Sequence, residues 1–84
     1  MEELSKQYYK IKEVAEILDV PQSTLRFWEK EFPMIKPIRS SHNIRYYRPQ
    51  DIELLRIIHY LIKDKGLKIE AAREQLRSNK HNVS

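Results

Sequence analysis

Positively charged side chains and two tyrosines occupy a stretch of the chain that contains no carboxylate. No Asp or Glu lies between Glu31 and Asp51. Because like charges in a small domain repel one another, such a stretch favours an anionic partner. Taken alone, it is equally typical of a solvated loop. The groups in it are Lys36, Arg39, His42, Arg45, Tyr46, Tyr47 and Arg48.

Residues for several other kinds of chemistry are missing. The chain has no cysteine and one glycine, Gly66, which excludes a thiolate metal site, a disulfide framework and a glycine-rich phosphate loop. The histidines, His42, His59 and His81, do not cluster in the sequence, and no Ser/His/acid grouping has catalytic spacing. We therefore expect no enzyme activity, no cofactor and no metal, and a packing role for a partly buried His59.

Length and composition indicate one soluble domain. The 84 residues contain 40% hydrophobic and 33% charged residues, with a net charge of +4, and we expect a core at 8–77 with frayed tails at 1–7 and 78–84. The longest apolar run, Tyr60 to Ile62, is too short to span a membrane. The acidic start lacks the features of a secretory signal, so we expect a cytoplasmic protein and no membrane partner.

Two apolar stripes with helical spacing predict two short helices in succession. The first stripe ends before Pro21 and the second before Pro33, because a proline disfavours helical backbone in the residue that precedes it. Two helices this close in sequence form a candidate helix-turn-helix. The stripes are Ile11, Val14, Ala15 and Leu18, and then Leu25, Trp28 and Phe32.

The opposite face of the second predicted helix carries hydroxyls, cations and an aromatic ring. Recognition helices present such a mixture to base edges and phosphates. The alternative is an ordinary solvent-exposed helix face without a partner. Phe27, which we expect to be exposed, argues against this alternative because phenylalanine is unusual on such a face. The residues of this face are Ser23, Thr24, Arg26, Phe27 and Lys30.

The cationic stretch predicts a hairpin over 36–47 with its turn at 41–43, since Asn43 tolerates left-handed backbone. Strand alternation places Ile44 and Tyr46 on one face, and Arg45 and Tyr47 on the other. A charged hairpin beside a helix-turn-helix is typical of a wing.

Two further helices complete the predicted fold. One runs from Pro49 to Lys65 with Gly66 as the residue that ends it, and the last runs from Ile69 to Arg77. The fold class is mainly α with a small β-hairpin, a winged helix-turn-helix of about four helices. Besides the first two stripes, the expected core residues are Tyr46, Leu54, Leu55, Ile58, Tyr60, Leu61, Ile62, Ile69, Ala72 and Leu76.

In order and spacing, several segments resemble the MerR-type DNA-binding domain over about residues 8 to 77. These segments are 9–15, 24–29, 44–47 before Asp51, and Gly66-Leu67 before a short helix. The resemblance implies a winged helix-turn-helix whose third and fourth helices are joined by a second wing. It also implies transcriptional regulation, with a homodimer formed by a C-terminal helix beyond this chain and RNA polymerase engaged indirectly at a promoter.

The resemblance implies DNA-contact roles position by position. It places Thr24, Arg26 and Phe27 on the recognition helix. It also places Arg45 and Tyr47 on the wing as phosphate contacts, Lys65 and Lys68 in the second wing, and Lys12 where the first helix approaches the DNA backbone.

The sequence departs from the family pattern at several helix starts and at the first-wing turn. Asn43 replaces a usual glycine, and Pro21, Arg48 and Lys68 stand where a Ser or Thr cap is common. A cation at a helix N-terminus costs up to about 1 kcal/mol. We therefore hypothesise that Arg48 and Lys68 contact phosphates that offset this cost.

Three functions remain open at this point. The first is sequence-specific binding of double-stranded DNA, with phosphate contacts that include Arg39, Arg45 and Arg48 and base contacts from Ser23, Thr24 and Arg26. The second is an excisionase-like architectural protein that bends DNA. The third is a winged-helix module that binds a protein.

Overall fold

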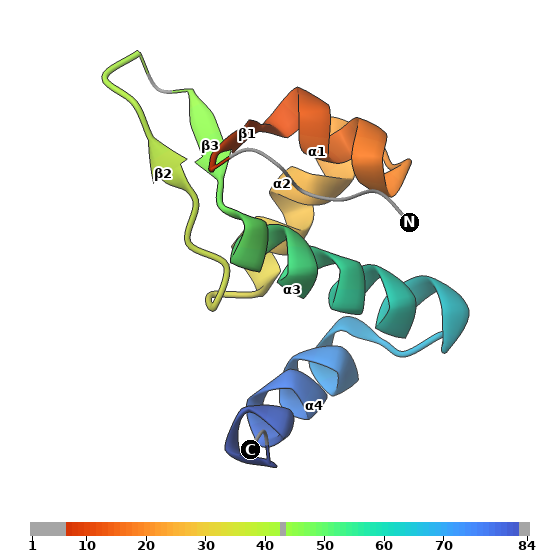
Figure 1. Ribbon diagram of the computed structural model, residues 1–84. Coiled ribbons are helices and arrows are strands. Elements are labelled where there is room, and N and C mark those ends of the chain that lie inside the picture. The colour runs from red at the N-terminus through yellow and green to blue at the C-terminus, as the bar shows by residue number, and fades with distance from the viewer. Residues whose placement is uncertain (1–6, 43, 83–84) are drawn as a thin grey trace.

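The computed structural model describes residues 7–42 and 44–82, which form four α-helices, one π-helical turn and a three-stranded sheet. Figure 1 shows the sheet at one end of the first three helices, with α4 beyond α3. In chain order the elements are β1 (Tyr9–Lys10), α1 (Ile11–Leu18), α2 (Gln22–Glu31), β2 (Ile38–Arg39), β3 (Arg45–Tyr47), α3 (Pro49–His59), η1 (Tyr60–Asp64) and α4 (Ile69–Asn82).

The helix-turn-helix forms as the apolar stripes predict. Helix α1 ends at Leu18, and the left-handed backbone of Asp19 (φ 58°), which caps it, turns the chain. Pro21 then precedes α2, and its carbonyl accepts the amide of Thr24 at 3.1 Å. Leu25, which is fully buried, faces the core from α2. The turn therefore lies where the sequence places it, and it presents α2 across the end of α1.

The sheet has one more strand than the predicted hairpin. Strand β1 pairs with β3 on the side opposite β2, so the strand order is β1-β3-β2 and both pairings are antiparallel. Tyr9 lies opposite Tyr47, and Ile38 opposite Tyr46. The two-residue β1 is too short to show strand alternation, which is why the sequence did not predict it. Asn43 of the predicted turn lies outside the described residues.

The third helix contains a change of helical type. Helix α3 begins at Pro49 as predicted, but from Tyr60 the chain continues as a π-helical turn in which the amide of Lys65 donates to the carbonyl of Tyr60 at 3.0 Å. Gly66 follows with a φ of 70°, the left-handed conformation that a glycine adopts at no steric cost. This wider turn directs the chain back toward α2.

Helix α4 continues to Asn82, beyond the predicted end at Arg77. Its last residues are polar and provide no apolar stripe, so the apolar pattern ended before the helix did. The predicted tail positions 1–6 and 83–84 lie outside the described residues.

One core joins every element except β2, whose two residues are exposed, and most of its members were expected. The differences are Tyr46 and Tyr60, which were expected in the core but lie outside it, and Tyr9, Ile35, Tyr47 and Ile52, which are buried without having been expected there. Tyr60 was placed in the core but is 51% exposed, because the neighbouring Leu61 takes the inward position on η1. Ile52 was not predicted, yet it is fully buried one turn before Leu55 on α3. Phe27, at 48% exposure, faces solvent as expected.

Candidate nucleic-acid interface

The predicted recognition residues share the outward side of α2. Ser23, Arg26, Phe27 and Lys30 are exposed and Thr24 is half-buried, because Leu25 and Trp28 take the inward positions of the same helix. The guanidinium of Arg26 lies 3.4 Å from the amide oxygen of Gln22, one turn earlier. Donors, a hydroxyl pair and an aromatic ring are therefore presented together on a helix face wide enough to meet a groove.

A hollow of about 490 Å³ lies where α2 meets η1 and α4. Its lining brings the start of the recognition face together with Lys63, which the sequence prediction did not include. In the last turn of a helix, a lysine is also expected simply as a favourable charge on the helix dipole, so the residue type of Lys63 alone did not indicate a role in this hollow. The π-helical turn is what carries it to α2, and nothing in the local pattern indicated that turn. The lining residues are Ser23, Thr24, Phe27, Trp28, Ile62, Lys63 and Ile69.

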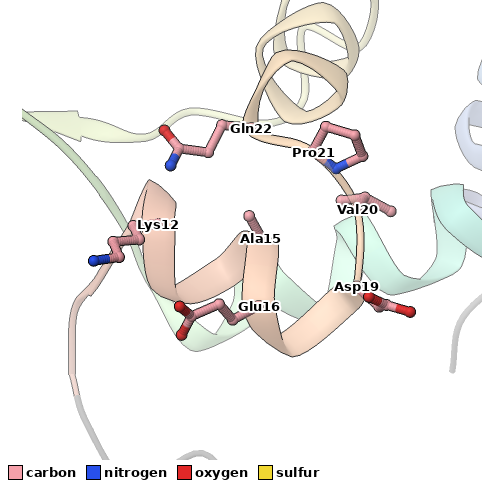
Figure 2. Close-up of a pocket in the computed structure, with 7 residues that line it drawn as sticks. All are labelled: Lys12, Ala15, Glu16, Asp19, Val20, Pro21 and Gln22. Carbon is pink, nitrogen blue, oxygen red and sulfur yellow. The ribbon is translucent and has the colours of Figure 1, made fainter.

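A second hollow, of about 540 Å³, lies between α1 and the start of α2. Figure 2 shows Lys12 and Gln22 on one side of it and Asp19 on the opposite side. Lys12 is exposed in the first turn of α1, and the amide of Gln22 is in the first turn of α2. The hollow therefore separates Lys12 from the turn that leads into α2, and contact of Lys12 with the DNA backbone stays a prediction.

The carboxylate of Glu29, on the wing side of α2, forms ion pairs or hydrogen bonds with three side chains of the sheet. The Nε atom of Arg45 lies 2.9 Å from Oε2 and 3.0 Å from Oε1, and Arg39 Nη2 lies 3.5 Å from Oε1. The hydroxyl of Tyr47 donates to Oε2 at 3.0 Å. Because the Glu29 side chain is only 12% exposed, these charge-assisted bonds lie in a partly desolvated place and fix the wing on α2.

Tyr47 is a core residue, which corrects the expectation of an outward phosphate contact. It has no exposed surface, and its hydroxyl is engaged by Glu29. Burial, followed by the charge and hydrogen bond of Glu29, raises the pKa of Tyr47 above its ordinary value. Alternation did place Arg45 and Tyr47 on the same face, but that face is turned toward α2 because Glu29 lies there.

Arg48 finds a partner for its charge within the chain. Its Nε and backbone N–H both donate to Asp51 Oδ2 at 3.0 Å, and this raises the pKa of Arg48. The buried carboxylate of Asp51 thus offsets the cost of a cation at the start of α3. Asp51 therefore supplies a counter-charge within the chain, and contact of the 36% exposed Arg48 side chain with a phosphate stays a prediction. Lys68, before α4, is exposed and makes no ion pair with another described residue.

The remaining cations define the charged part of the surface. Within residues 7–42 and 44–82, these Lys and Arg side chains are exposed and make no ion pair with a described partner: Lys10, Lys12, Arg26, Lys30, Lys36, Lys63, Lys65 and Lys68. They come from β1, α1, α2, the approach to β2, η1 and the η1–α4 loop. The same described part of the chain holds no group of three His, Asp or Glu placed to bind a metal ion, and no helix there is long and apolar enough to cross a membrane.

The sequence pattern of a known family covers most of this fold. Residues 9–79 match the model of the family described as MerR HTH family regulatory protein. The chain belongs to the MerR family of helix-turn-helix regulatory proteins. The match spans β1 to α4, so it includes both the helix-turn-helix and the loop that contains Lys65 and Lys68. Because the family consists of regulatory proteins, membership also supports the expectation that this chain is not an enzyme.

Curated members of the MerR family resemble the chain at about the same level. It is 30% identical over 70 residues to the HTH-type transcriptional repressor CarA of Myxococcus xanthus, covering 82% of this chain and 24% of CarA. It is 31% identical over 68 residues to the transcriptional regulator ZntR of Escherichia coli, covering 81% and 48%. For MlrA of Salmonella typhimurium the identity is 32% over 71 residues, covering 84% and 29%. The chain thus spans at most about half the length of these MerR-family relatives.

A solved MerR-family structure shares the fold. HiNmlR, a MerR family regulator lacking the sensor domain and bound to promoter DNA, superposes with a TM-score of 0.73 at 20% sequence identity. The similarity covers 90% of this chain and 57% of HiNmlR. The expected winged helix-turn-helix is therefore confirmed, with β1 as an addition to the predicted hairpin.

Proposed function

We propose that this chain binds double-stranded DNA in a sequence-specific manner as the DNA-binding domain of a transcriptional regulator. Helix α2 enters the major groove, and the β2–β3 hairpin lies along the phosphate backbone. The observation that carries the proposal is the exposed face of α2, where hydroxyls, Arg26 and Phe27 adjoin a hollow edged by Lys63. Family membership agrees with it.

The proposed contacts divide into base readers and phosphate contacts. Ser23, Thr24 and Arg26 lie nearest the start of α2, the part of a recognition helix that meets base edges. The exposed lysines supply phosphate contacts from both sides of α2: Lys12 and Lys30, and in the second wing Lys65 and Lys68. Among the wing arginines, Arg39 extends furthest into solvent, with a side chain 49% exposed against 22% for Arg45. Arg39 is therefore the wing cation best placed to reach a phosphate.

We propose that this domain acts as part of a longer regulator. HiNmlR is bound to promoter DNA. From the resemblance to the MerR-type domain, we propose a cytoplasmic regulator that acts at promoters as a homodimer and affects RNA polymerase through the DNA. In this proposal the dimer forms through a further helix C-terminal to α4. One domain then binds one half-site.

Two other functions predict different behaviour. An architectural protein would bend many duplexes with little sequence preference, and a protein-binding module would use the Arg26 face on an acidic protein and ignore DNA. Membership in a family of regulatory proteins favours the regulator over both.

The test begins with selection of duplexes from a random library, followed by titration of the best duplex at several salt concentrations. Contact with four or five phosphates predicts that log K falls with log salt at a slope of about −4. Arg26→Gln should lower the preference for the selected sequence, whereas the matched control Arg77→Gln, on the exposed side of α4, should not. Absence of salt-dependent binding would overturn the proposal, and equal affinity for all duplexes would favour the architectural role.

A further inference from the structure

We propose that Arg73 is a positioning residue for DNA recognition, because its guanidinium caps the C-terminus of α2 and ties the direction of that helix to α4. The inference rests on the proposed function, in which α2 is the element that enters the groove. It concerns a residue on α4 that touches no part of the predicted recognition face.

The contact joins residues far apart in the sequence. Arg73 Nη1 donates to the backbone carbonyl oxygen of Glu31 at 2.7 Å and lies 3.4 Å from Glu31 Oε1. Glu31 is the last residue of α2, and the last carbonyls of a helix have no partner within it. A cation there also meets the negative end of the helix dipole. The guanidinium therefore satisfies an acceptor that α2 leaves open.

The position of Arg73 on α4 is well anchored. Ala72 is fully buried and Leu76 nearly so, and both belong to the core. The Arg73 side chain is 27% exposed, so water screens the contact only in part. One turn further along, Arg77 is 62% exposed and pairs with Glu74 on its own helix. The two arginines carry the same charge on the same element, but only Arg73 reaches α2.

The other end of α2 is held by its own backbone. Pro21 precedes the helix with no side-chain cap, and its carbonyl accepts the amides of Thr24 and Leu25. Arg73 thus provides a side-chain bond at the C-terminal end, and with it a fixed angle between the recognition face and α4. If the cap is lost, α2 adopts a wider range of directions. Only molecules in which α2 keeps the direction that fits the groove then bind DNA, and the apparent affinity falls in proportion to their fraction.

The experiment compares Arg73→Gln with Arg77→Gln, since each removes one charge from α4. We expect Arg73→Gln to weaken binding of the selected duplex about tenfold, with the salt slope unchanged, and Arg77→Gln to leave both unchanged. Arg73→Lys should restore most of the affinity, because an ammonium can donate to the same carbonyl. Glu31→Gln should bind like the parent protein, because the main-chain oxygen makes the shorter bond.

A second measurement follows the cap itself, without DNA. In Arg73→Gln the carbonyl ¹³C resonance of Glu31 and the amide resonance of Phe32 should shift, and in Arg77→Gln they should not. Equal DNA affinities of the two variants would overturn the positioning role. A salt slope that is reduced by about one in Arg73→Gln would also overturn it, because such a reduction indicates the loss of a phosphate contact. If the parent protein bound no DNA, the proposed function and the role of Arg73 in it would both fail, while the carbonyl shift would still decide whether the cap exists.

Discussion

The carboxylate of Glu29 and the guanidinium of Arg45 form a two-point ion pair between the recognition helix and the wing. Nε of Arg45 lies within 3.0 Å of both carboxylate oxygens, across sixteen residues of sequence. Arg39 and Tyr47 bind the same carboxylate. A single side chain of α2 therefore fixes the wing on the helix, and the Arg45 guanidinium, with a side chain 22% exposed, has a counter-charge within the protein.

Replacing Glu29 should loosen this junction. Glu29→Gln leaves the partly buried Arg45 without its counter-charge, and we expect it to lower the free energy of unfolding by about 2–3 kcal/mol. Urea unfolding followed by tryptophan fluorescence measures the change. The control is Glu53→Gln, whose carboxylate is 61% exposed and 3.9 Å from Arg56; it should change stability by less than about 0.5 kcal/mol. Equal effects would show that Glu29 does not hold the wing.

Tyr47 gives the fold a dependence on alkaline pH. Burial and Glu29 raise its folded-state pKa above the ordinary 10.0. The protonated Tyr47 hydroxyl therefore contributes its full stabilisation of the fold at any pH below the unfolded-state pKa. This stabilisation is lost as the pH rises from about 10 toward the folded pKa, at about 1.4 kcal/mol per pH unit. The advantage of the parent protein over Tyr47→Phe, about 1–2 kcal/mol at neutral pH, should therefore shrink above pH 10. Unfolding curves between pH 8 and 11 test this, and a constant difference would contradict it.

Adjacent aromatic residues on α2 should separate binding from stability. Phe27 is 48% exposed, whereas Trp28 is 2% exposed and packs edge-on against His59 at 5.9 Å between ring centroids. Phe27→Ala should weaken DNA binding about tenfold and change stability by less than about 1 kcal/mol. Trp28→Ala should cost about 3–5 kcal/mol of stability. A large loss of stability in Phe27→Ala would mean that its ring packs against the core.

The second wing depends on one backbone conformation. Gly66 has a φ of 70°, and a Cβ there would meet no heavy atom within 4 Å. The cost of Gly66→Ala is therefore conformational, about 1 kcal/mol, and Gly66→Asn should cost less because asparagine tolerates left-handed backbone. Thermal unfolding of the two variants measures the order. If both cost the same, the turn has another source of strain.

Features of the sequence determined the helical part of the fold. Apolar spacing and the prolines at 21, 33 and 49 place α1, α2 and the start of α3, and Gly66 marks the turn before α4. These signals depend on residues a few positions apart, which is the range over which helical periodicity and proline geometry act. The recognition face was predictable for the same reason, because the spacing of residues along a helix determines which side chains share one face.

Only the tertiary structure decided how the charges are used. The acid-free stretch is neutralised in part by Glu29 and Asp51, which precede and follow it, and most of the cations left exposed without an ion pair are lysines on other elements. Ion pairs, the burial of Tyr47 and the cap that Arg73 places on α2 depend on which surfaces the core brings together. Residues distant in sequence meet there, and no local pattern encodes their distance. Sequence thus located the candidate DNA-binding surface, and packing selected which of its charges face outward.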